Sequence, residues 1–198
     1  KEMLPVVDKP LIQYAVEEAR DAGIEEFIFV TGRGKTIIED HFDRSYELES
    51  VLNERQKNDV LREIQEGVPK AGSIAYIRQQ EPLGLGHAVW CAKRLVGDEP
   101  FAVILADDLI LADTPCLAQM TAAREEIGGG NMLAVMEVPK EHTSRYGILS
   151  PGKEEKNLIE IKGLVEKPAP ADAPSNLAVI GRYILEPNIF DLLENQAR

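Results

Sequence analysis

The sequence predicts an α/β protein, with a doubly wound half followed by a smaller strand-rich part. Three observations predict this class. A helical apolar pattern over residues 10–22 leads through Gly23 into a buried strand over 26–31, which makes a helix–strand unit. Residues 101–106 form a continuous apolar run, typical of a central strand of a parallel sheet. Beyond residue 138 the pattern changes to short strands separated by loops that contain proline and glycine.

The elements follow from the same periodicities. Asp8 and Pro10 begin the first helix, since aspartate can cap a helix and proline is tolerated in its first turn. The helix expected over 46–66 is long, with one apolar side and a charged, solvated face. The Gly128–Gly130 triplet follows a helix rather than a strand, which favours a flexible linker over a phosphate loop. Further helices are expected over 35–42, 85–96 and 115–127, and further strands over 73–78, 132–138, 146–149, 158–165 and 178–185.

Length and charge limit the class of protein. The 198 residues can bury one substantial core, so we expect a single domain, with halves over 1–138 and 139–198. A net charge of -12, from 22 basic and 34 acidic residues, argues against broad binding of nucleic acid or anionic membrane. It leaves room for a small anionic ligand held by local lysines, backbone amides or a metal ion.

The reactive side chains are few. Cys91 and Cys116 cannot form a disulfide framework, and we expect buried thiols in a reducing compartment. His41 and His142 lie in charged contexts and are expected at the surface. No covalent nucleophile is indicated by a Ser-His-Asp or Cys-His arrangement. No run is long and apolar enough to span a bilayer, so we expect a cytoplasmic protein with no membrane partner and no nucleic-acid partner.

Ligands of open α/β sheets bind beyond the carboxyl ends of the strands, and four segments are expected there. In the first, Asp107 and Asp108 directly follow the most apolar strand. Carboxylate oxygens suit Mg²⁺, which often shares the phosphates of a substrate. A turn or a helix cap explains the two carboxylates equally well.

The second segment, residues 78–89, leaves a strand, crosses a glycine loop and enters a helix. It matches a dinucleotide fingerprint incompletely, because Val89 stands where the third glycine would be. Its glycines still let backbone approach a ligand, and a helix N-terminus favours an anion. Gln79 offers both a donor and an acceptor, as reading the edge of a nucleobase requires, whereas His87 is expected to be structural.

The third segment is Glu166 and Lys167, at the end of a strand. A carboxylate can bind sugar hydroxyls and a lysine is a point charge for phosphate. We expect Pro168 to bend the chain so that both side chains face one side; an exposed ion pair before a loop is the alternative. The fourth is Tyr146–Gly147, where the glycine would let backbone lie against a ligand, and where an ordinary turn is equally compatible.

Together these segments resemble the bacterial UTP–glucose-1-phosphate uridylyltransferase branch of the sugar-nucleotide pyrophosphorylase family. The resembling residues run in order along the chain: Lys1–Tyr14, Gly84–Val89, Leu105–Asp108, Val165–Pro168 and Ala173–Tyr183. Five matched segments are far more specific than any one of them. The resemblance implies a Rossmann-like nucleotidyltransferase domain, a mixed and mostly parallel sheet flanked by helices, with a nucleotide-binding half over 1–138 and a strand-rich sugar-binding part over 139–198.

The resemblance also implies an activity, namely formation of UDP-glucose and pyrophosphate from UTP and glucose 1-phosphate with Mg²⁺. The sugar phosphate would attack the α-phosphorus of UTP in line. The implied roles are phosphate contact for Lys1, an adjoining substrate contact for Glu2, uridine recognition for Gln79 and Gly84, metal binding for Asp107, sugar contact for Gly147, Glu166 and Val179, and contact with the product phosphate for Lys167. We also expect a homo-oligomer.

Two parts of the family pattern stand outside the printed sequence. They are a glycine-rich loop with a Thr-Arg pair before Lys1, and a Gly-Glu-Ile-Gln-Leu-Thr-Asp segment with a second metal aspartate after Arg198. We expect both in the protein, as loops that order when substrate binds.

Three alternatives stay open. A related pyrophosphorylase would use dTTP, ATP or another hexose 1-phosphate. A nucleotide-sugar binding module without catalysis would keep Gln79 and Glu166 but would not need Lys1 or Mg²⁺. A metal-dependent glycosyltransferase is disfavoured because Asp107-Asp108-Leu109 lacks the Asp-x-Asp spacing.

Overall fold

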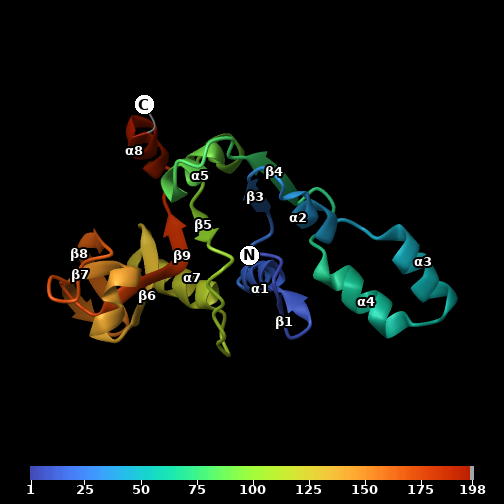
Figure 1. Ribbon diagram of the computed structural model, residues 1–198, viewed down its shortest axis with the longest axis horizontal. Helices are drawn as coiled ribbons and strands as arrows, with labels where there is room; N and C mark the ends of the chain where they lie inside the picture. Colours follow the sequence, from blue (N-terminus) through green and yellow to red (C-terminus); the bar gives the residue numbers. More distant parts are fainter. Residues whose placement is uncertain (197–198) are drawn as a thin grey trace. The chain divides into compact units, whose positions relative to one another are not determined.

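A computed structural model describes residues 1–196, with the side chains of residues 1–194 (Figure 1). The elements in chain order are β1 (Pro5–Val6), β2 (Lys9–Pro10), α1 (Leu11–Asp21), β3 (Phe27–Thr31), α2 (Thr36–His41), α3 (Tyr46–Glu54), α4 (Asn58–Gly67), β4 (Ile74–Arg78), α5 (Leu85–Cys91), α6 (Lys93–Val96), β5 (Phe101–Ile104), α7 (Cys116–Ile127), β6 (Met132–Glu137), the 3₁₀ helix η1 (Lys140–Arg145), β7 (Gly147–Glu155), β8 (Leu158–Glu166), β9 (Leu177–Leu185) and α8 (Ile189–Gln196).

The contacts divide the chain into two compact units. One contains residues 1–99 and the segment from residue 187 onward, and the other contains residues 100–186. The sequence suggested halves that meet at residue 138. The difference arises because β5 and β6, which come before that residue, both pair with β9.

The first unit is built on a parallel pair of strands. β3 pairs with β4 over five residues, from Phe27 opposite Ile74 to Thr31 opposite Arg78. α1 buries the apolar stripe that the sequence predicts, including Val16 and Ala19. The helix ends in a Schellman turn at Gly23, whose φ is +89°: the amide of Ile24 donates to the carbonyl oxygen of Ala19, and that of Gly23 to Arg20.

The start of α1 differs from the prediction. Asp8 does not cap the helix; its carboxylate lies 3.4 Å from the Tyr14 hydroxyl, which donates mainly to the carbonyl oxygen of Val6 at 2.8 Å. The first amides of α1 are satisfied by backbone, since Leu11 donates to the carbonyl oxygen of Leu4. Ile12 donates to the carbonyl oxygen of Glu2 at 2.9 Å. The segment before the helix therefore acts as its cap, which propensity at one position does not reveal.

The helix expected over 46–66 is two helices, α3 and α4, which pack on one another as a hairpin (Figure 1). The break falls at Gln56, a non-glycine residue with a φ of +56°. The amide of Lys57 donates to the carbonyl oxygen of Leu52, which closes the turn. The apolar side of the segment continues through the break, so its periodicity concealed the turn.

The second unit is a five-stranded sheet with the order β5-β9-β7-β8, in which β6 also pairs with β9. β5 runs antiparallel to β9, from Phe101 opposite Leu185, whereas the apolar run at 101–106 predicted a parallel neighbour. Burial of both faces of a strand gives the same apolar run in either direction. Val138, Ile148 and Ala178 form a buried cluster under η1 and β7.

The Gly128–Gly130 triplet is a structured turn and not a flexible linker. All three glycines have positive φ angles, of 81°, 112° and 103°. Gly128 ends α7 in a Schellman turn, as the amide of Gly129 donates to the carbonyl oxygen of Arg124. The carboxylate of Glu186 then accepts hydrogen bonds from the amide of Gly130 and from the Arg124 guanidinium. The sequence hides this turn because Glu186 lies 56 residues away from Gly130.

The predicted α/β class is confirmed, with a parallel pair of strands in one unit and a strand-rich antiparallel sheet in the other.

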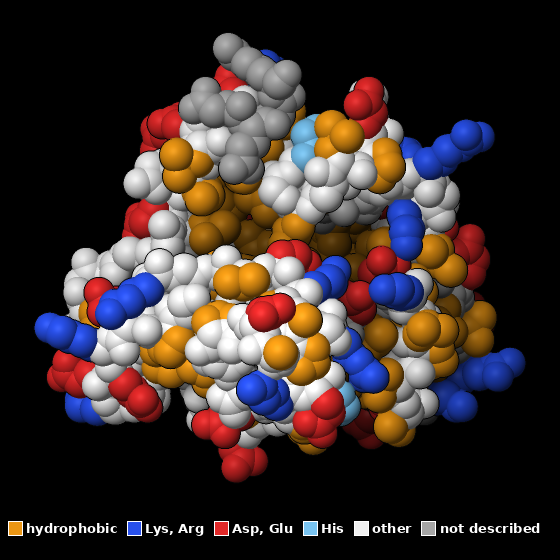
Figure 2. All heavy atoms as spheres, turned by 60° about the vertical axis from the view of Figure 1, so that its left-hand side comes forward, with side chains coloured by type: hydrophobic (Ala, Val, Ile, Leu, Met, Phe, Trp, Pro, Cys, Tyr) orange, Lys and Arg blue, Asp and Glu red, His pale blue; other side chains and the backbone are white. Residues whose placement is uncertain are grey.

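On the face drawn in Figure 2, basic and acidic side chains are interspersed among apolar ones. Within residues 1–196, no helix has the length and apolarity needed to cross a membrane. The two cysteines predicted as buried thiols are each half-buried.

Candidate active site

Three residues predicted to contact a sugar lie together in the second unit. Gly147 opens β7 directly opposite Glu166, the last residue of β8. A side-chain carbon placed on Gly147 would lie 3.3 Å from Oε2 of Glu166 and 3.9 Å from Cγ2 of Val179. The bare Cα of Gly147 thus lets a carboxylate and an apolar methyl group lie close to the backbone. A sugar could contact both, because its hydroxyl groups can donate to the carboxylate and its apolar face can pack on the methyl group.

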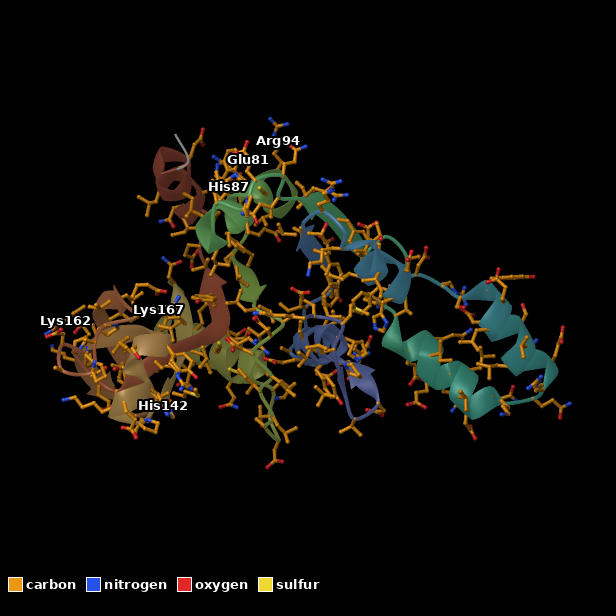
Figure 3. The ribbon with its side chains drawn as sticks, in the orientation of Figure 1. Glu81, His87, Arg94, His142, Lys162 and Lys167 are labelled. Carbon is orange, nitrogen blue, oxygen red and sulfur yellow. The ribbon has the colours of Figure 1, made fainter. Side chains whose placement is uncertain are left out.

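Lys167 follows Glu166 and turns out of the strand. Its φ is +47°, its amide donates to the carbonyl oxygen of Tyr146 at 2.9 Å, and Pro168 behind it is buried. This conformation places Nζ of Lys167 3.2 Å from Oε1 of Glu166. Both side chains are mostly exposed, at 60% and 74%, so their ion pair is worth little and each remains available to a ligand. Lys167 is labelled in Figure 3. The bend that the sequence assigned to Pro168 lies one residue earlier.

The two aspartates after β5 have different surroundings. Asp108 accepts a hydrogen bond from the amide of Gly181 through Oδ2 at 2.9 Å. A side-chain carbon on Gly181 would lie 2.5 Å from Cβ of Leu105, so this close approach requires glycine. Asp107 is exposed. The turn-carboxylate reading therefore applies to Asp108, and Asp107 is the better candidate for a metal ligand.

Arg182 holds the turn that carries both aspartates. It is 1% exposed and donates to the carbonyl oxygens of Leu105 and Asp108 at 3.1 and 2.9 Å. Sequence reasoning noted Arg182 only inside the segment Ala173–Tyr183 and gave it no role. The signal that could have found it is a single arginine within an otherwise apolar strand, since buried arginines are almost always paired.

Tyr183 is a second residue that sequence reasoning left without a role. Burial raises the pKa of its phenol, and the charges of Asp108 and Glu166 raise it further. Tyr183 pairs with Val103 of β5 and with Leu133 of β6, which puts it in the middle of the sheet.

The carboxylate of Asp107 fits a hard divalent cation that keeps most of its water ligands. Across the described residues, no group of three histidine, cysteine or acidic side chains could enclose a metal ion. Mg²⁺ does not need such a cage, because it retains waters and commonly takes one or two carboxylates together with substrate phosphates. One exposed carboxylate beside an anionic substrate is compatible with that mode and not with a structural zinc site.

The predicted base-reading residues lie in the first unit. Gln79 follows β4. Its backbone amide donates a hydrogen bond to the carbonyl oxygen of Thr31, which continues the parallel pairing of β3 and β4. Its side-chain Nε2 donates to the carbonyl oxygen of Gly84 at 3.0 Å and lies 3.0 Å from Nδ1 of His87. Gly84 has a φ of +94° and precedes α5. The structure therefore joins Gln79 with Gly84 and with His87.

The second glycine of this segment serves packing. A side-chain carbon on Gly86 would lie 3.0 Å from Cδ2 of Leu193 on α8, a helix that the sequence did not predict. Gly86 therefore lets α5 and α8 approach closely, which is a packing role for this glycine.

Glu2 lies beside a lysine that sequence reasoning missed. Nζ of Lys35, in the loop after β3, is 2.6 Å from Oε2 of Glu2. This hydrogen bond lowers the pKa of Glu2 from its ordinary 4.5 to about 2. The carbonyl oxygen of Lys1 accepts from the amide of Leu4, and its side chain is exposed. The surroundings of Lys1 and Glu2 thus contain a second cation, which only the fold brings to them.

His41, predicted at the surface, is half-buried. Its Nε2 lies 2.9 Å from Oε1 of Gln13, a side chain 6% exposed that also donates to the carbonyl oxygen of Gly67. Burial lowers the pKa of His41. These bonds connect α1, α2 and the end of α4, so His41 has a structural role.

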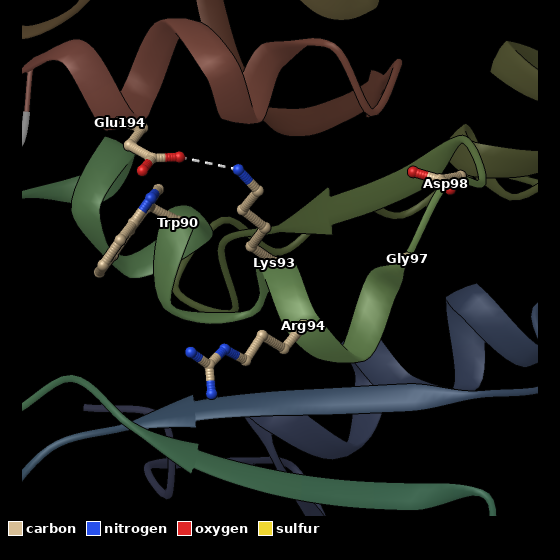
Figure 4. A pocket seen from close by; sticks show the side chains of 6 residues that line it. All are labelled: Trp90, Lys93, Arg94, Gly97, Asp98 and Glu194. Atoms are coloured by element: carbon tan, nitrogen blue, oxygen red, sulfur yellow. Dashed lines mark hydrogen bonds and ion pairs between the residues drawn. The ribbon is translucent and has the colours of Figure 1, made fainter.

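A cavity of about 390 Å³ lies within the first unit. Its lining consists of Trp90, Lys93, Arg94, Gly97, Asp98 and Glu194 (Figure 4). Lys93 and Glu194, two of its four charged lining residues, form an ion pair at 2.8 Å. No residue predicted to bind substrate lines it.

The predicted residues thus fall into two sets. The first unit holds Lys1, Glu2, Gln79 and Gly84, and the second holds Asp107, Gly147, Glu166, Lys167 and Val179. Within them, the structure joins Gln79 with Gly84, and Gly147 with Glu166, Val179 and Lys167.

Comparisons with known proteins all find nucleotidyl transferases. A protein-family model described as nucleotidyl transferase matches residues 1–198. The UTP–glucose-1-phosphate uridylyltransferase of Bacillus subtilis (strain 168) is 53% identical over 99% of this chain and 66% of its own length. The chain thus spans about two thirds of that relative. A crystal structure of a UDP-glucose pyrophosphorylase complexed with UDP-glucose is 48% identical, with a TM-score of 0.84 over 98% of this chain and 70% of its own. A UTP-bound relative from Acinetobacter baumannii is 43% identical, with a TM-score of 0.89 over 98% and 69% of the two chains.

Proposed function

Because this chain belongs to the nucleotidyl transferase family, we propose that its protein transfers a uridylyl group to glucose 1-phosphate. The resemblance found in the sequence motifs is confirmed at the level of the family. One observation carries the activity: 53% identity over 99% of the chain to an enzyme named UTP–glucose-1-phosphate uridylyltransferase. The proposed products are UDP-glucose and pyrophosphate.

The reaction forms one bond and breaks one. A phosphate oxygen of glucose 1-phosphate attacks the α-phosphorus of UTP, and the bond from that phosphorus to the bridging oxygen of the β-phosphate breaks. The electron pair leaves with pyrophosphate. Little covalent chemistry is required of the protein, so positioning of the reactants and neutralisation of their charge account for catalysis.

On the nucleotide, Gln79 and Gly84 are the proposed contacts for the base. Lys1 would bind phosphate. Glu2 is ionised and paired with Lys35. This pairing would keep Lys35 from competing with Lys1 for the phosphate oxygens.

On the sugar phosphate, Gly147 and Val179 would border the hexose, and Glu166 would accept hydrogen bonds from its hydroxyl groups. Lys167 would neutralise the phosphate that becomes part of the product. Support comes from the closeness of Glu166 and Val179 to Gly147, and from the weak, exposed ion pair of Glu166 and Lys167, in which a phosphate can take the place of the carboxylate.

Mg²⁺ is the proposed metal, and Asp107 its proposed ligand from this chain. When bound, it would supply positive charge to the phosphate oxygens and so reduce their repulsion. Asp108 and Arg182 would keep the turn of Asp107 in place through their backbone contacts.

The activity is tested with the full-length protein, UTP, glucose 1-phosphate and Mg²⁺, by measuring pyrophosphate release and UDP-glucose together. Equal amounts of both products are expected, with loss of both on addition of EDTA. A panel of dTTP, ATP and other hexose 1-phosphates tests the related pyrophosphorylases. Binding of UDP-glucose by calorimetry without turnover would instead support a binding module.

A homo-oligomer and a cytoplasmic location remain part of the proposal. Light scattering after size-exclusion chromatography tests the first, and cell fractionation tests the second.

A further inference from the structure

The side-chain amide of Gln79 has a defined orientation. One face of it meets the carbonyl oxygen of Gly84 at 3.0 Å. A carbonyl oxygen only accepts hydrogen bonds, so the nitrogen of the amide, and not its oxygen, must face Gly84. That carbonyl is itself fixed, because it also accepts the first helical hydrogen bond of α5, from the amide of Ala88 at 3.1 Å.

The second hydrogen of this amide goes to His87. Nε2 of Gln79 lies 3.0 Å from Nδ1 of His87. Since that nitrogen of Gln79 is a donor, Nδ1 must be an acceptor, and the neutral imidazole carries its proton on Nε2. The ring is fixed in plane by stacking on Trp90, with centroids 5.8 Å apart and an interplanar angle of 19° (His87 is labelled in Figure 3).

Both hydrogens of the Gln79 side-chain amide are therefore donated within the first unit, one to Gly84 and one to His87. The remaining polar atom is Oε1, an acceptor. If the amide turned over, Oε1 would face the carbonyl oxygen of Gly84, where like partial charges repel, and the contact with His87 would persist only if the imidazole moved its proton to Nδ1. The pair formed by His87 and Gly84 thus decides which atom Gln79 offers to a ligand.

We propose that His87 is a positioning residue that sets base selectivity by presenting Gln79 Oε1 as an acceptor. The inference rests on the proposed function, since it takes Gln79 to read the base. Uracil has an N–H at ring position 3 and can donate to this oxygen. Cytosine has an unprotonated nitrogen there, so two acceptors would face one another. Thymine shares the N–H of uracil, and therefore this device separates uridine from cytidine nucleotides but not UTP from dTTP.

Two substitutions distinguish the effect of the hydrogen bond between Gln79 and His87 from the effect of the ring stacked on Trp90. His87→Phe keeps a flat ring over Trp90 but removes the acceptor, whereas His87→Asn places an amide oxygen near the position of Nδ1. The measured quantities are kcat/KM for UTP and for CTP in the full-length protein, and calorimetric affinities for UMP and CMP. We expect the UTP-to-CTP ratio to fall about tenfold in His87→Phe, the value of one lost hydrogen bond, and to stay within about twofold of wild type in His87→Asn.

Several results would overturn the inference. An unchanged ratio in a folded His87→Phe protein is one, and equal affinities of the wild-type protein for UMP and CMP are another. The ¹⁵N spectrum of the wild-type protein needs no variant: the neutral tautomer with its proton on Nδ1 would refute the role of His87. If UMP is preferred over CMP but no UDP-glucose forms, the proposed activity fails while the selectivity device stands.

Discussion

Nζ of Lys167 lies 3.2 Å from Oε1 of Glu166, its neighbour in the chain. Successive residues of a strand point to opposite faces of a sheet, so two neighbours meet only where the strand ends abruptly. The φ of +47° at Lys167 provides that ending and costs about 1 kcal/mol or more for a residue other than glycine. Backbone strain of this kind clusters at functional sites, which is consistent with the proposed role of Lys167.

Replacement of Lys167 separates charge from strain. Lys167→Ala removes the ammonium group and keeps the unfavourable φ, whereas Lys167→Gly removes both. We expect each variant to lose roughly 10²–10³-fold in kcat, as for other lost electrostatic partners. Urea unfolding should show the glycine variant to be more stable than the alanine variant by about 1 kcal/mol. Near-normal turnover in either protein would exclude Lys167 from the site.

The two adjacent aspartates should respond differently to substitution. Asp107→Asn should abolish Mg²⁺-dependent turnover with little change in the melting temperature. Asp108→Ala should lower stability by roughly 1–3 kcal/mol, because it leaves the amide of Gly181 without its acceptor. Asp108→Asn is the matched control, since its amide oxygen can still accept that bond. Equal loss of stability in both Asp108 variants would contradict the assigned hydrogen bond.

Gly147→Ala should interfere with the sugar and spare the nucleotide. The added carbon would lie 3.3 Å from Glu166, a side chain 74% exposed that can move aside, so the fold should be preserved. We expect a rise in KM for glucose 1-phosphate of about tenfold, from crowding worth roughly 1–2 kcal/mol, with KM for UTP unchanged. Gly163→Ala, another strand glycine with ordinary 3.8 Å contacts, is the control and should leave both constants as they are.

The pKa of Glu2 reports its contact with Lys35. Its hydrogen bond to Lys35 lowers this pKa from 4.5 to about 2, so the folded state binds the proton less tightly than the unfolded state. The contact therefore stabilises the fold above pH 4.5 and loses that effect as the pH falls toward about 2. In Lys35→Met, the ¹³C titration of the Glu2 carboxyl group should move back toward 4.5. A midpoint that stays near 2 would show that another group lowers it.

The sequence alone was sufficient for much of this protein. Helical periodicity predicted α1 and its end at Gly23, and the segments at Gly84, Asp107 and Glu166 indicated the family through their residue types and their order along the chain. These features are local, because a helix repeat, a turn glycine or a motif is complete within a few residues.

Only the tertiary structure decided which atoms meet. Asp108 accepts from Gly181, 73 residues away, and Lys35 reaches Glu2 across 33 residues. Gln79 and His87 are near in sequence, yet the orientation of the amide depends on the carbonyl direction set by Gly84. Hydrogen bonds require a defined distance and angle between donor and acceptor, and pairing over such separations is fixed by strand register and turns rather than by residue type. Residue types therefore determined the family and the candidate residues, while the fold decided that Asp107 is exposed, that Asp108 bonds the amide of Gly181 and that the amide nitrogen of Gln79 faces Gly84.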